Sequence, residues 1–366
     1  MNEELMKIAS EFHIDGRIHD VVSLSEGFIN DTYFVRLIGE EEPAYVLQRK
    51  NQFVFRNVPA MMQNINLVTS HLKKIITEKG GDPMRESLTI TPALSGNLYY
   101  RDKESEIWAM CTYIKKSKNF QRVDSPELAC AGGKAIGKFH SMLADFEMPL
   151  TDILPGFHNM RFRFDQWDQS LAENVAGRVS GLNREIEWIE NRRNEMMEFY
   201  SLIENQKIKS RVAHNDTKIS NVLFDDKGDV LCLIDLDTVF NSAILNDFGD
   251  AIRTYANTGE EDDTRLDSVN LNLEIFESFS RGYLAQAIDF LSEPELEYLA
   301  FSAKYITFEQ VLRFLMDYIN GDKYYKIKSP EHNLQRTYAQ YKLLQSMENN
   351  FDYMKQSVKN IVLKYK

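Results

Sequence analysis

The stretch VAHNDTKISNVLFDDKGDVLCLIDLDTV, residues 212–239, joins a polar loop, two short apolar runs and an acidic turn in direct succession. The letters DDKGD between the apolar runs are a turn signal, so residues 222–234 are predicted to form a β-hairpin. Asp216 and Asn221 precede the hairpin, and Asp235 follows its second strand. Because a hairpin runs out and back, we expect the three side chains to meet at one end of a small sheet.

These side chains are of the types that phosphoryl transfer requires. A carboxylate accepts the proton of the attacking hydroxyl, an amide and a second carboxylate hold Mg²⁺ on the phosphates of ATP, and a cation lies near the transferred group. The chain offers one of each in Asp216, Asn221, Asp235 and Lys218. His214, Asp216 and Asn221 also have the spacing of the kinase motif H-R-D-x-x-x-x-N. We therefore predict Asp216 and Lys218 as catalytic residues and Asn221 and Asp235 as metal ligands.

Two neighbouring motifs are interpreted as support for this loop. His214 is expected to brace it by hydrogen bonding, since the adjacent carboxylate already suits the role of proton acceptor. The letters DFG at residues 247–249 would name the metal-binding Asp of a protein kinase. They follow a further connection after the hairpin, however, whereas Asp235 follows its second strand directly. We interpret DFGDAIR as the start of a helix beneath the loop, with Asp250 a candidate to brace it.

The rest of the chain predicts an α+β fold in two domains, because 366 residues exceed one ordinary core. Residues 1–113 contain one helix and then five or six short strands, with a second helix inserted at residues 58–81. Residues 114–366 are mostly helical and carry the catalytic hairpin. The predicted architecture is a small antiparallel sheet with one inserted helix, followed by a larger helical domain.

Bulk properties limit the partners. The formal charge of −12 argues against broad binding to nucleic acid, whose phosphates select positive surfaces. The three cysteines have no CxxC spacing, which argues against disulfides and zinc and fits a reducing cytoplasm; Cys232, among apolar neighbours, is interpreted as core. We find no signal peptide and no apolar run of membrane-spanning length. We expect a cytoplasmic protein that binds small molecules and functions as a monomer.

At these motifs the chain resembles the aminoglycoside phosphotransferase and choline kinase superfamily, whose members share the two-lobed protein kinase fold and phosphorylate small molecules. It is similar in particular to N-acetylhexosamine 1-kinases, through HNDTKISNVLFD, IDLDTV, DFGDAIR, RFLMDYINGDKYY and PEHNLQRT, and near the start through GFINDTYFV and YVLQ. The resemblance covers nearly the whole chain. It implies ATP- and Mg²⁺-dependent phosphorylation of the anomeric hydroxyl of N-acetylglucosamine or N-acetylgalactosamine, and it leaves the preference between them open.

The resemblance also implies a sugar site. Arg313 and Tyr324 match positions that contact the sugar in that family, and Asp237 is placed to face either metal or sugar. In the helical stretch KYITFEQVLRFLMDYINGD, Glu309, Arg313 and Asp317 recur every fourth residue and share one face. One interpretation is a solvated stripe with helical ion pairs. The other, favoured by the resemblance, is a polar stripe turned toward a sugar pocket.

The nucleotide side departs from the kinase template. The stretch SEGFINDTY has the right place to cover phosphates but holds one glycine, and a plain hairpin turn explains it nearly as well. The segment MCTYIKKS is the expected linker whose backbone reads the adenine edge. The candidate nucleotide contacts are Gly27, Phe28, Ile29, Thr32, Thr112 and Ile114.

Gln48 occupies the position where the template has its phosphate-binding lysine. The helix that should supply the glutamate partner offers Asn64 and Asn66. Lys50 and Arg49 are the neighbouring cations available to take over, although Arg49 should point to the opposite face of the strand from Gln48.

Two other functions stay open at this level. One is a kinase of the same superfamily with another acceptor, such as an aminoglycoside, choline, homoserine or another sugar. The other is a catalytically silent pseudokinase that binds nucleotide or a partner, motivated by Gln48 and the missing glutamate. The retained base and metal-ligand residues argue against the silent protein, because a silent site has no chemical need for all of them.

Overall fold

The computed structural model describes residues 2–24 and 29–366, so the candidates Gly27 and Phe28 lie outside the described residues. The chain divides into two compact units. Unit 1 comprises Met1–Asn119, Met142–Leu154 and Asn221–Asn241, and unit 2 comprises Phe120–Ser141, Pro155–Ser220 and Ser242–Lys366. Among the helices of the described residues, none is both long enough and apolar enough to cross a membrane.

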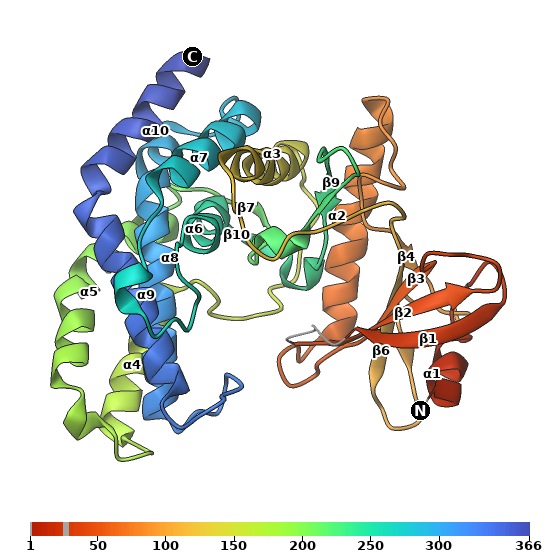
Figure 1. Cartoon of the computed structure of the whole chain (residues 1–366), viewed down its shortest axis with the longest axis horizontal. Helices are drawn as coiled ribbons and strands as arrows, with labels where there is room; N and C mark the ends of the chain where they lie inside the picture. Colours follow the sequence, from red (N-terminus) through yellow and green to blue (C-terminus); the bar gives the residue numbers. More distant parts are fainter. Residues whose placement is uncertain (1, 25–28) are drawn as a thin grey trace. The chain divides into compact units, whose positions relative to one another are not determined.

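Unit 1 is built on a six-stranded antiparallel sheet, which confirms the prediction of five or six strands (Figure 1). The strands follow the order β1-β2-β3-β6-β4, with β5 also paired to β6. Their bounds are β1 Ile18–Leu24, β2 Asp31–Leu37, β3 Tyr45–Arg49, β4 Ile90–Thr91, β5 Tyr100–Arg101 and β6 Ile107–Thr112. The register places Thr32 opposite Gln48 across β2 and β3.

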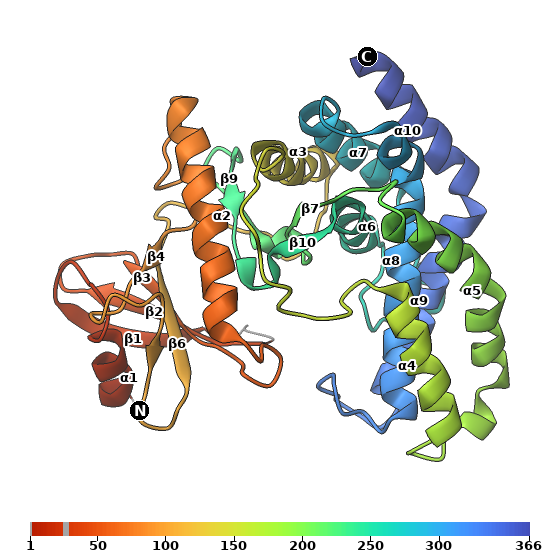
Figure 2. The same cartoon turned by 180° about the vertical axis from the view of Figure 1, so that it is seen from behind.

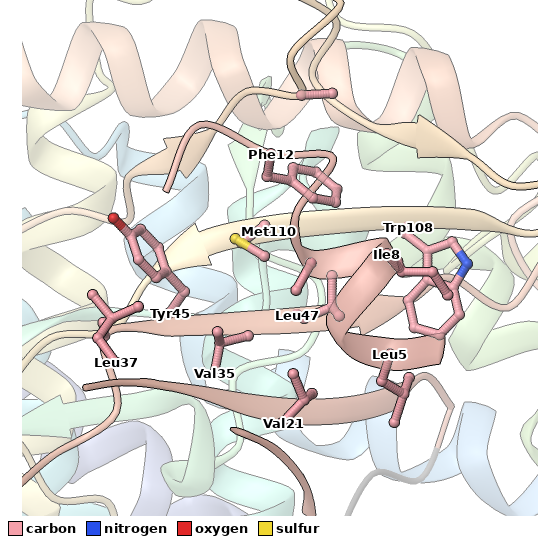
Figure 3. Close-up of a cluster of buried hydrophobic side chains, with 13 residues drawn as sticks. Leu5, Ile8, Phe12, Val21, Val35, Leu37, Tyr45, Leu47, Trp108 and Met110 are labelled. Carbon is pink, nitrogen blue, oxygen red and sulfur yellow. The ribbon is translucent and has the colours of Figure 1, made fainter. Parts of the chain in front are cut away.

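One face of this sheet carries an apolar core (Figure 3). Side chains alternate along a strand, so Val35 and Leu37 of β2 lie on the same face and are both buried. Leu5 and Ile8, from helix α1 (Asn2–Ala9), join them in one cluster. The sheet face covered by α1 is therefore structural.

Helix α2 (Val58–Glu78) is the predicted inserted helix. It begins where the Asn57 side chain accepts the amide of Ala60, with a proline in its first turn. Its buried Asn64 donates to the carbonyls of Thr151, at 2.8 Å, and Val239, at 3.0 Å. These bonds fix α2 to the segment after the catalytic hairpin, within unit 1.

The predicted hairpin is confirmed as β8 (Val222–Phe224) paired antiparallel with β9 (Val230–Leu233). Asp225 Oδ1 accepts the amides of Lys227 and Asp229, each at 2.9 Å, and Gly228 has a φ of +89°, which suits glycine. A 3₁₀ turn, η3 (Leu236–Thr238), follows.

By its contacts the hairpin groups with unit 1, whereas the division at residue 113 assigned it to the second part of the chain. The physical reason is local packing. Ile114, Leu231 and Cys232 form one buried cluster, which also places Cys232 in a core as predicted. Phe224 and Lys118 exchange backbone hydrogen bonds of 2.8 and 2.9 Å.

Unit 2 is mainly helical, as predicted. Its longest helix, α8, packs against α4, α6, α9 and α10, and α4 also contacts α5 (Figure 2). The helices are α3 Pro126–Met142, α4 Met160–Glu173, α5 Asn183–Glu204, α6 Ile244–Tyr255, α7 Leu273–Ala287, α8 Glu293–Ile319, α9 His332–Asn349 and α10 Phe351–Tyr365. Two short strands, β7 (Ser210–Ala213) and β10 (Phe240–Ala243), were not predicted, because four residues are too few for a clear alternation. Single 3₁₀ turns are η1 Val179–Gly181, η2 Ile219–Asn221 and η4 Leu266–Ser268.

Candidate active site

The loop after β7 carries His214, Asn215 and Asp216, and helix α6 holds it in place. Asp247 of α6 accepts the amides of His214 and Asn215, each at 2.7 Å, with its two carboxylate oxygens. Thr217 continues the pattern, since its amide donates to Asp250 Oδ2 at 3.1 Å. Both acidic residues of DFGD thus bind the backbone of the predicted catalytic loop, and α6 is the helix that the sequence predicts there.

Asp247 is itself oriented from behind. His140 of α3 donates from Nε2 to Asp247 Oδ2 at 2.8 Å, because a carboxylate can only accept. His140 Nδ1 lies 3.1 Å from the hydroxyl of Tyr283, so each ring nitrogen has a partner. Burial alone would raise the pKa of Asp247, but His140 and the backbone amide of His214 hold it below its ordinary value of 3.8. The brace is therefore a buried carboxylate that is charged at neutral pH.

The other letters of DFG have packing roles. Phe248 is fully buried against the aromatic rings of Phe276 and Phe279. A Cβ on Gly249 would stand 2.3 Å from the carbonyl oxygen of Ser302, so glycine lets α6 approach α8 closely. The sequence predicts Asp250 as a brace of the loop but gives no signal for the bonds of Asp247.

Asp216 and Lys218 form an ion pair within unit 2. Lys218 Nζ lies 3.0 Å from Asp216 Oδ2, and the two side chains are 38% and 26% exposed. The amide of Asp216 donates to His214 Nδ1 at 3.3 Å, and Asn215 adopts a left-handed φ of +62°. The local backbone thus leaves the Asp216 carboxylate partly exposed while its neighbours His214 and Asn215 are buried.

Asn221 and Asp235 belong to unit 1, at the two open ends of the hairpin. The amide of Ile234 donates to the Asn221 carbonyl at 2.9 Å, which brings the backbone before Asp235 alongside Asn221. Asp235 has a φ of +59°, a conformation that Asp and Asn tolerate better than most residues. Asp237, two residues on in η3, is buried.

Asp237 binds a lysine. Lys50 Nζ lies 2.7 and 2.8 Å from its two carboxylate oxygens, and Asn30 Nδ2 donates to Oδ2 at 2.7 Å. The same ammonium donates to Gln48 Oε1 at 2.6 Å. Arg49 instead pairs with Asp31 on the opposite face of the strand from Gln48, as strand alternation predicts.

The other nucleotide candidates hydrogen-bond to neighbouring residues of unit 1 or are buried there. Thr32 Oγ1 accepts from Gln48 Nε2 at 3.3 Å, and the Ile29 carbonyl accepts from Asn51 Nδ2 at 3.2 Å. The Thr112 amide donates to the Thr89 carbonyl at 2.9 Å and is thereby committed to the sheet. Ile114 is buried and lies in the segment that follows β6.

The polar stripe on α8 is not solvated, so that interpretation is wrong. Glu309 is 1% exposed, accepts from His158 Nδ1 at 2.7 Å and pairs with Arg163 at 3.1 Å. Burial would raise the pKa of Glu309, but the charges of His158 and Arg163 hold it far below its ordinary range. Glu309 is therefore committed to ion pairs within unit 2 and not turned toward a pocket.

Asp317 is likewise committed. Its Oδ1 accepts the amides of Lys323 and Tyr324, each at 2.9 Å, and its Oδ2 accepts the amide of Tyr325 at 3.0 Å. Asn333 of α9 adds a bond to Oδ2 at 2.9 Å. The RFLxDYxxGD block thus encodes a carboxylate that folds the segment after α8 and fixes the backbone of Tyr324.

Arg313 differs from these two acids. Its guanidinium lies 5.5 to 5.7 Å from the ring centroids of Phe157, Tyr324 and Tyr325. Its hydrogen bond to a side chain is with the neutral oxygen of Gln310, at 3.3 Å. The carboxylate of Glu309, four residues earlier on α8, acts electrostatically on this guanidinium. Of the three aromatic residues, Tyr324 is the most exposed, at 54%.

A sheet with one long helix, a helical unit and a braced HND loop define the kinase-like phosphotransferases. The chain belongs to the phosphotransferase enzyme family, APH, whose model matches residues 20–273.

Solved structures share the fold. A microcompartment-associated aminopropanol kinase is 16% identical, with a TM-score of 0.61 over 96% of this chain and 98% of that chain. A choline kinase from Cryptosporidium parvum Iowa II is 13% identical, with a TM-score of 0.56 over 99% of each. The amicoumacin kinase hAmiN, solved with AMP-PNP, Ca²⁺ and Ami, is 13% identical, with a TM-score of 0.57 over 94% and 93%.

Proposed function

We propose that this phosphotransferase moves the γ-phosphoryl group of ATP to the anomeric hydroxyl of an N-acetylhexosamine, with N-acetylglucosamine and N-acetylgalactosamine as the candidate acceptors. Asp216 accepts the proton of the C1 hydroxyl, and Lys218, whose ammonium is paired with it, lies near the transferred group. The similarity of HNDTKISNVLFD and IDLDTV to N-acetylhexosamine 1-kinases supports these roles.

Asn221 and Asp235 are the proposed Mg²⁺ ligands. The donor set fits, because an amide and a carboxylate oxygen are the hard ligands that Mg²⁺ prefers, and the metal usually takes its remaining ligands from phosphates and water. The bond between Ile234 and Asn221 keeps the two ligand-bearing segments adjacent. A bound Mg²⁺ would neutralise charge on the phosphate oxygens.

The observation that carries the acceptor assignment is Arg313. Its guanidinium, beside the rings of Phe157, Tyr324 and Tyr325, repels an ammonium group and donates hydrogen bonds to neutral oxygens. Choline and aminoglycosides are cations, whereas an N-acetylhexosamine offers hydroxyls, an acetamido carbonyl and a ring face for aromatic contact. The surroundings of Arg313 support the uncharged sugar.

The alternatives differ in the acceptor. The structural neighbours named above are kinases of aminopropanol, choline and amicoumacin, so a panel must include amines as well as sugars. Purified protein with MgATP is given N-acetylglucosamine, N-acetylgalactosamine, glucose, galactose, choline, homoserine or kanamycin, and ADP release is followed.

We expect release that depends on the N-acetylhexosamines. Dependence on choline, homoserine or kanamycin alone would reject the sugar assignment while keeping the kinase. Nucleotide binding with no turnover of any acceptor would favour the pseudokinase.

A further inference from the structure

Lys50 follows β3 directly and points into unit 1. Its side chain is 3% exposed, whereas the neighbouring Arg49 is 43% exposed and pairs with Asp31. Gln48 and Lys50 are two residues apart, so they share one face of the strand, opposite to that of Leu47 and Arg49. The lysine therefore lies on the face where the kinase template has its phosphate-binding cation, one alternation further along the chain.

The partners of Lys50 are unequal. Asp237 engages the ammonium with both carboxylate oxygens, at 2.7 and 2.8 Å, while Gln48 offers a neutral amide oxygen at 2.6 Å. The contact with Asp237 joins two opposite charges, whereas in the bond to Gln48 only the lysine is charged. An anionic oxygen that reached this ammonium would therefore displace Gln48 and leave the Asp237 contact in place.

The pair lies beside two other parts of the expected nucleotide site. Asn30, directly before β2, donates to Asp237 at 2.7 Å. Burial raises the pKa of the Cys111 thiol to about 11, and the charges of Lys50, Asp237 and Asp235 all act on that thiol. Lys50 thus shares its electrostatic surroundings with the proposed metal ligand Asp235, within one unit.

Helix α2 does not compete for the lysine. Asn64, on its buried face, donates to the carbonyls of Thr151 and Val239 and accepts the Thr151 amide at 3.0 Å. The carboxylate that kinases draw from this helix is supplied here by η3.

We propose that Lys50 anchors the phosphates of the nucleoside triphosphate, and that Asp237 is the carboxylate that positions it. The chain thereby keeps a lysine–acid pair like that of the kinase template. The lysine stands two positions after Gln48, and the acid comes from η3 in place of the helix. This inference rests on the proposed function as an ATP-dependent kinase. It gives Asp237 a role other than contact with metal or sugar.

The test is nucleotide binding without acceptor, by titration calorimetry. MgATP, MgADP and AMP are titrated into the wild type, Lys50→Met and the matched control Arg49→Met. We expect Lys50→Met to weaken MgATP and MgADP at least 10-fold, the effect of losing one charged hydrogen bond, and to leave AMP unchanged. Arg49→Met should bind like the wild type. Equal affinity of Lys50→Met and wild type for MgATP, or a wild type that binds no nucleotide, overturns the proposal.

A double variant separates an anchoring from a structural role. Lys50→Met leaves Asp237 as an unpaired buried acid, which by itself can disturb folding. In Lys50→Met/Asp237→Asn both charges are gone, and thermal unfolding should show recovered stability. If Lys50 only stabilises the fold, the double variant regains MgATP affinity; if Lys50 anchors phosphate, it stays weak.

The outcomes also separate this inference from the proposed function. If the wild type does not phosphorylate N-acetylhexosamines yet Lys50→Met loses phosphate affinity, the acceptor assignment fails and the inference stands. If the sugar is phosphorylated and Lys50→Met keeps the KM for ATP, the inference fails alone.

Discussion

Asp216 is the residue on which the proposed chemistry depends, and its surroundings allow a selective test. Asp216→Asn keeps the size of the side chain and removes the proton acceptor. Because a positioned base contributes roughly 100- to 10,000-fold, we expect kcat to fall by that factor while MgATP affinity is unchanged. Steady-state kinetics and calorimetry measure the two quantities.

The matched control is Asp226→Asn, an exposed acid at the tip of the catalytic hairpin. It should leave kcat unchanged. An Asp216→Asn variant with wild-type turnover would remove Asp216 from the mechanism.

Arg313 is the residue that discriminates between acceptors. Arg313→Met keeps an apolar stem among the aromatic rings and removes the hydrogen-bond donors. A hydrogen bond from a charged group contributes about 1.5–3 kcal/mol, so we expect the KM for N-acetylhexosamine to rise about 10- to 100-fold with little change in the KM for ATP. Arg161→Met, which breaks the surface pair with Glu204, is the control. If the only effect of Arg313→Met were a lower KM for choline or kanamycin, the site would instead bind cationic acceptors.

At the scale of elements, the contact between α6 and the catalytic loop is a pH-dependent brace. Asp247→Asn loses a charge that accepts two backbone amides and the His140 ring, and we expect a loss of roughly 3 kcal/mol in the free energy of unfolding at pH 7. The folded-state pKa of Asp247 lies below 3.8, so its contribution is complete above 3.8 and disappears as pH falls further.

Urea unfolding at pH 7, 5, 4 and 3 measures this effect. The difference between wild type and Asp247→Asn should be constant from pH 7 to 5 and should shrink below the ordinary carboxyl range. A difference that grows toward pH 3 would contradict the assigned direction.

The crossing of α6 and α8 depends on Gly249. A Cβ there meets the Ser302 carbonyl carbon at 2.7 Å as well as its oxygen, so the backbone of α8 must move. We expect Gly249→Ala to destabilise the protein by about 1–3 kcal/mol and to lower activity through the loop that α6 holds. Gly181→Ala, where an added Cβ meets no atom within 4 Å, is the control and should change stability by less than about 0.5 kcal/mol. Equal melting temperatures for both variants would mean that α8 yields without cost.

At the scale of the whole molecule, the sequence predicts the elements better than the contacts between them. Alternation and turn signals located the strands of unit 1, the helix α2 and the hairpin, because these depend on neighbours in the chain. The pair of Lys50 and Asp237 joins positions 187 residues apart, and His158 and Glu309 are 151 apart. Periodicity carries no information on such pairs. The sequence therefore leaves the partner of Asp237 open, and it does not predict the buried contacts of the polar stripe on α8.

Asp247 was missed for a related reason. Asp247 belongs to the letters DFG, which match a metal-binding motif of protein kinases. Once that role is rejected, no local feature of the sequence indicates its bonds to the loop amides 32 and 33 residues earlier. Alternation and turn signals predicted the α+β fold, the family resemblance implied its kinase-like form, and the family match over residues 20–273 agrees with both.

Identifying the reaction product tests the proposed phosphorylation of the anomeric hydroxyl. The protein is incubated with MgATP and N-acetylglucosamine or N-acetylgalactosamine, and the purified sugar phosphate is examined by ³¹P and ¹H NMR. We predict a phosphomonoester whose phosphorus couples to the anomeric proton H1. A phosphate at another hydroxyl, or ADP formation without a sugar phosphate, would contradict the account.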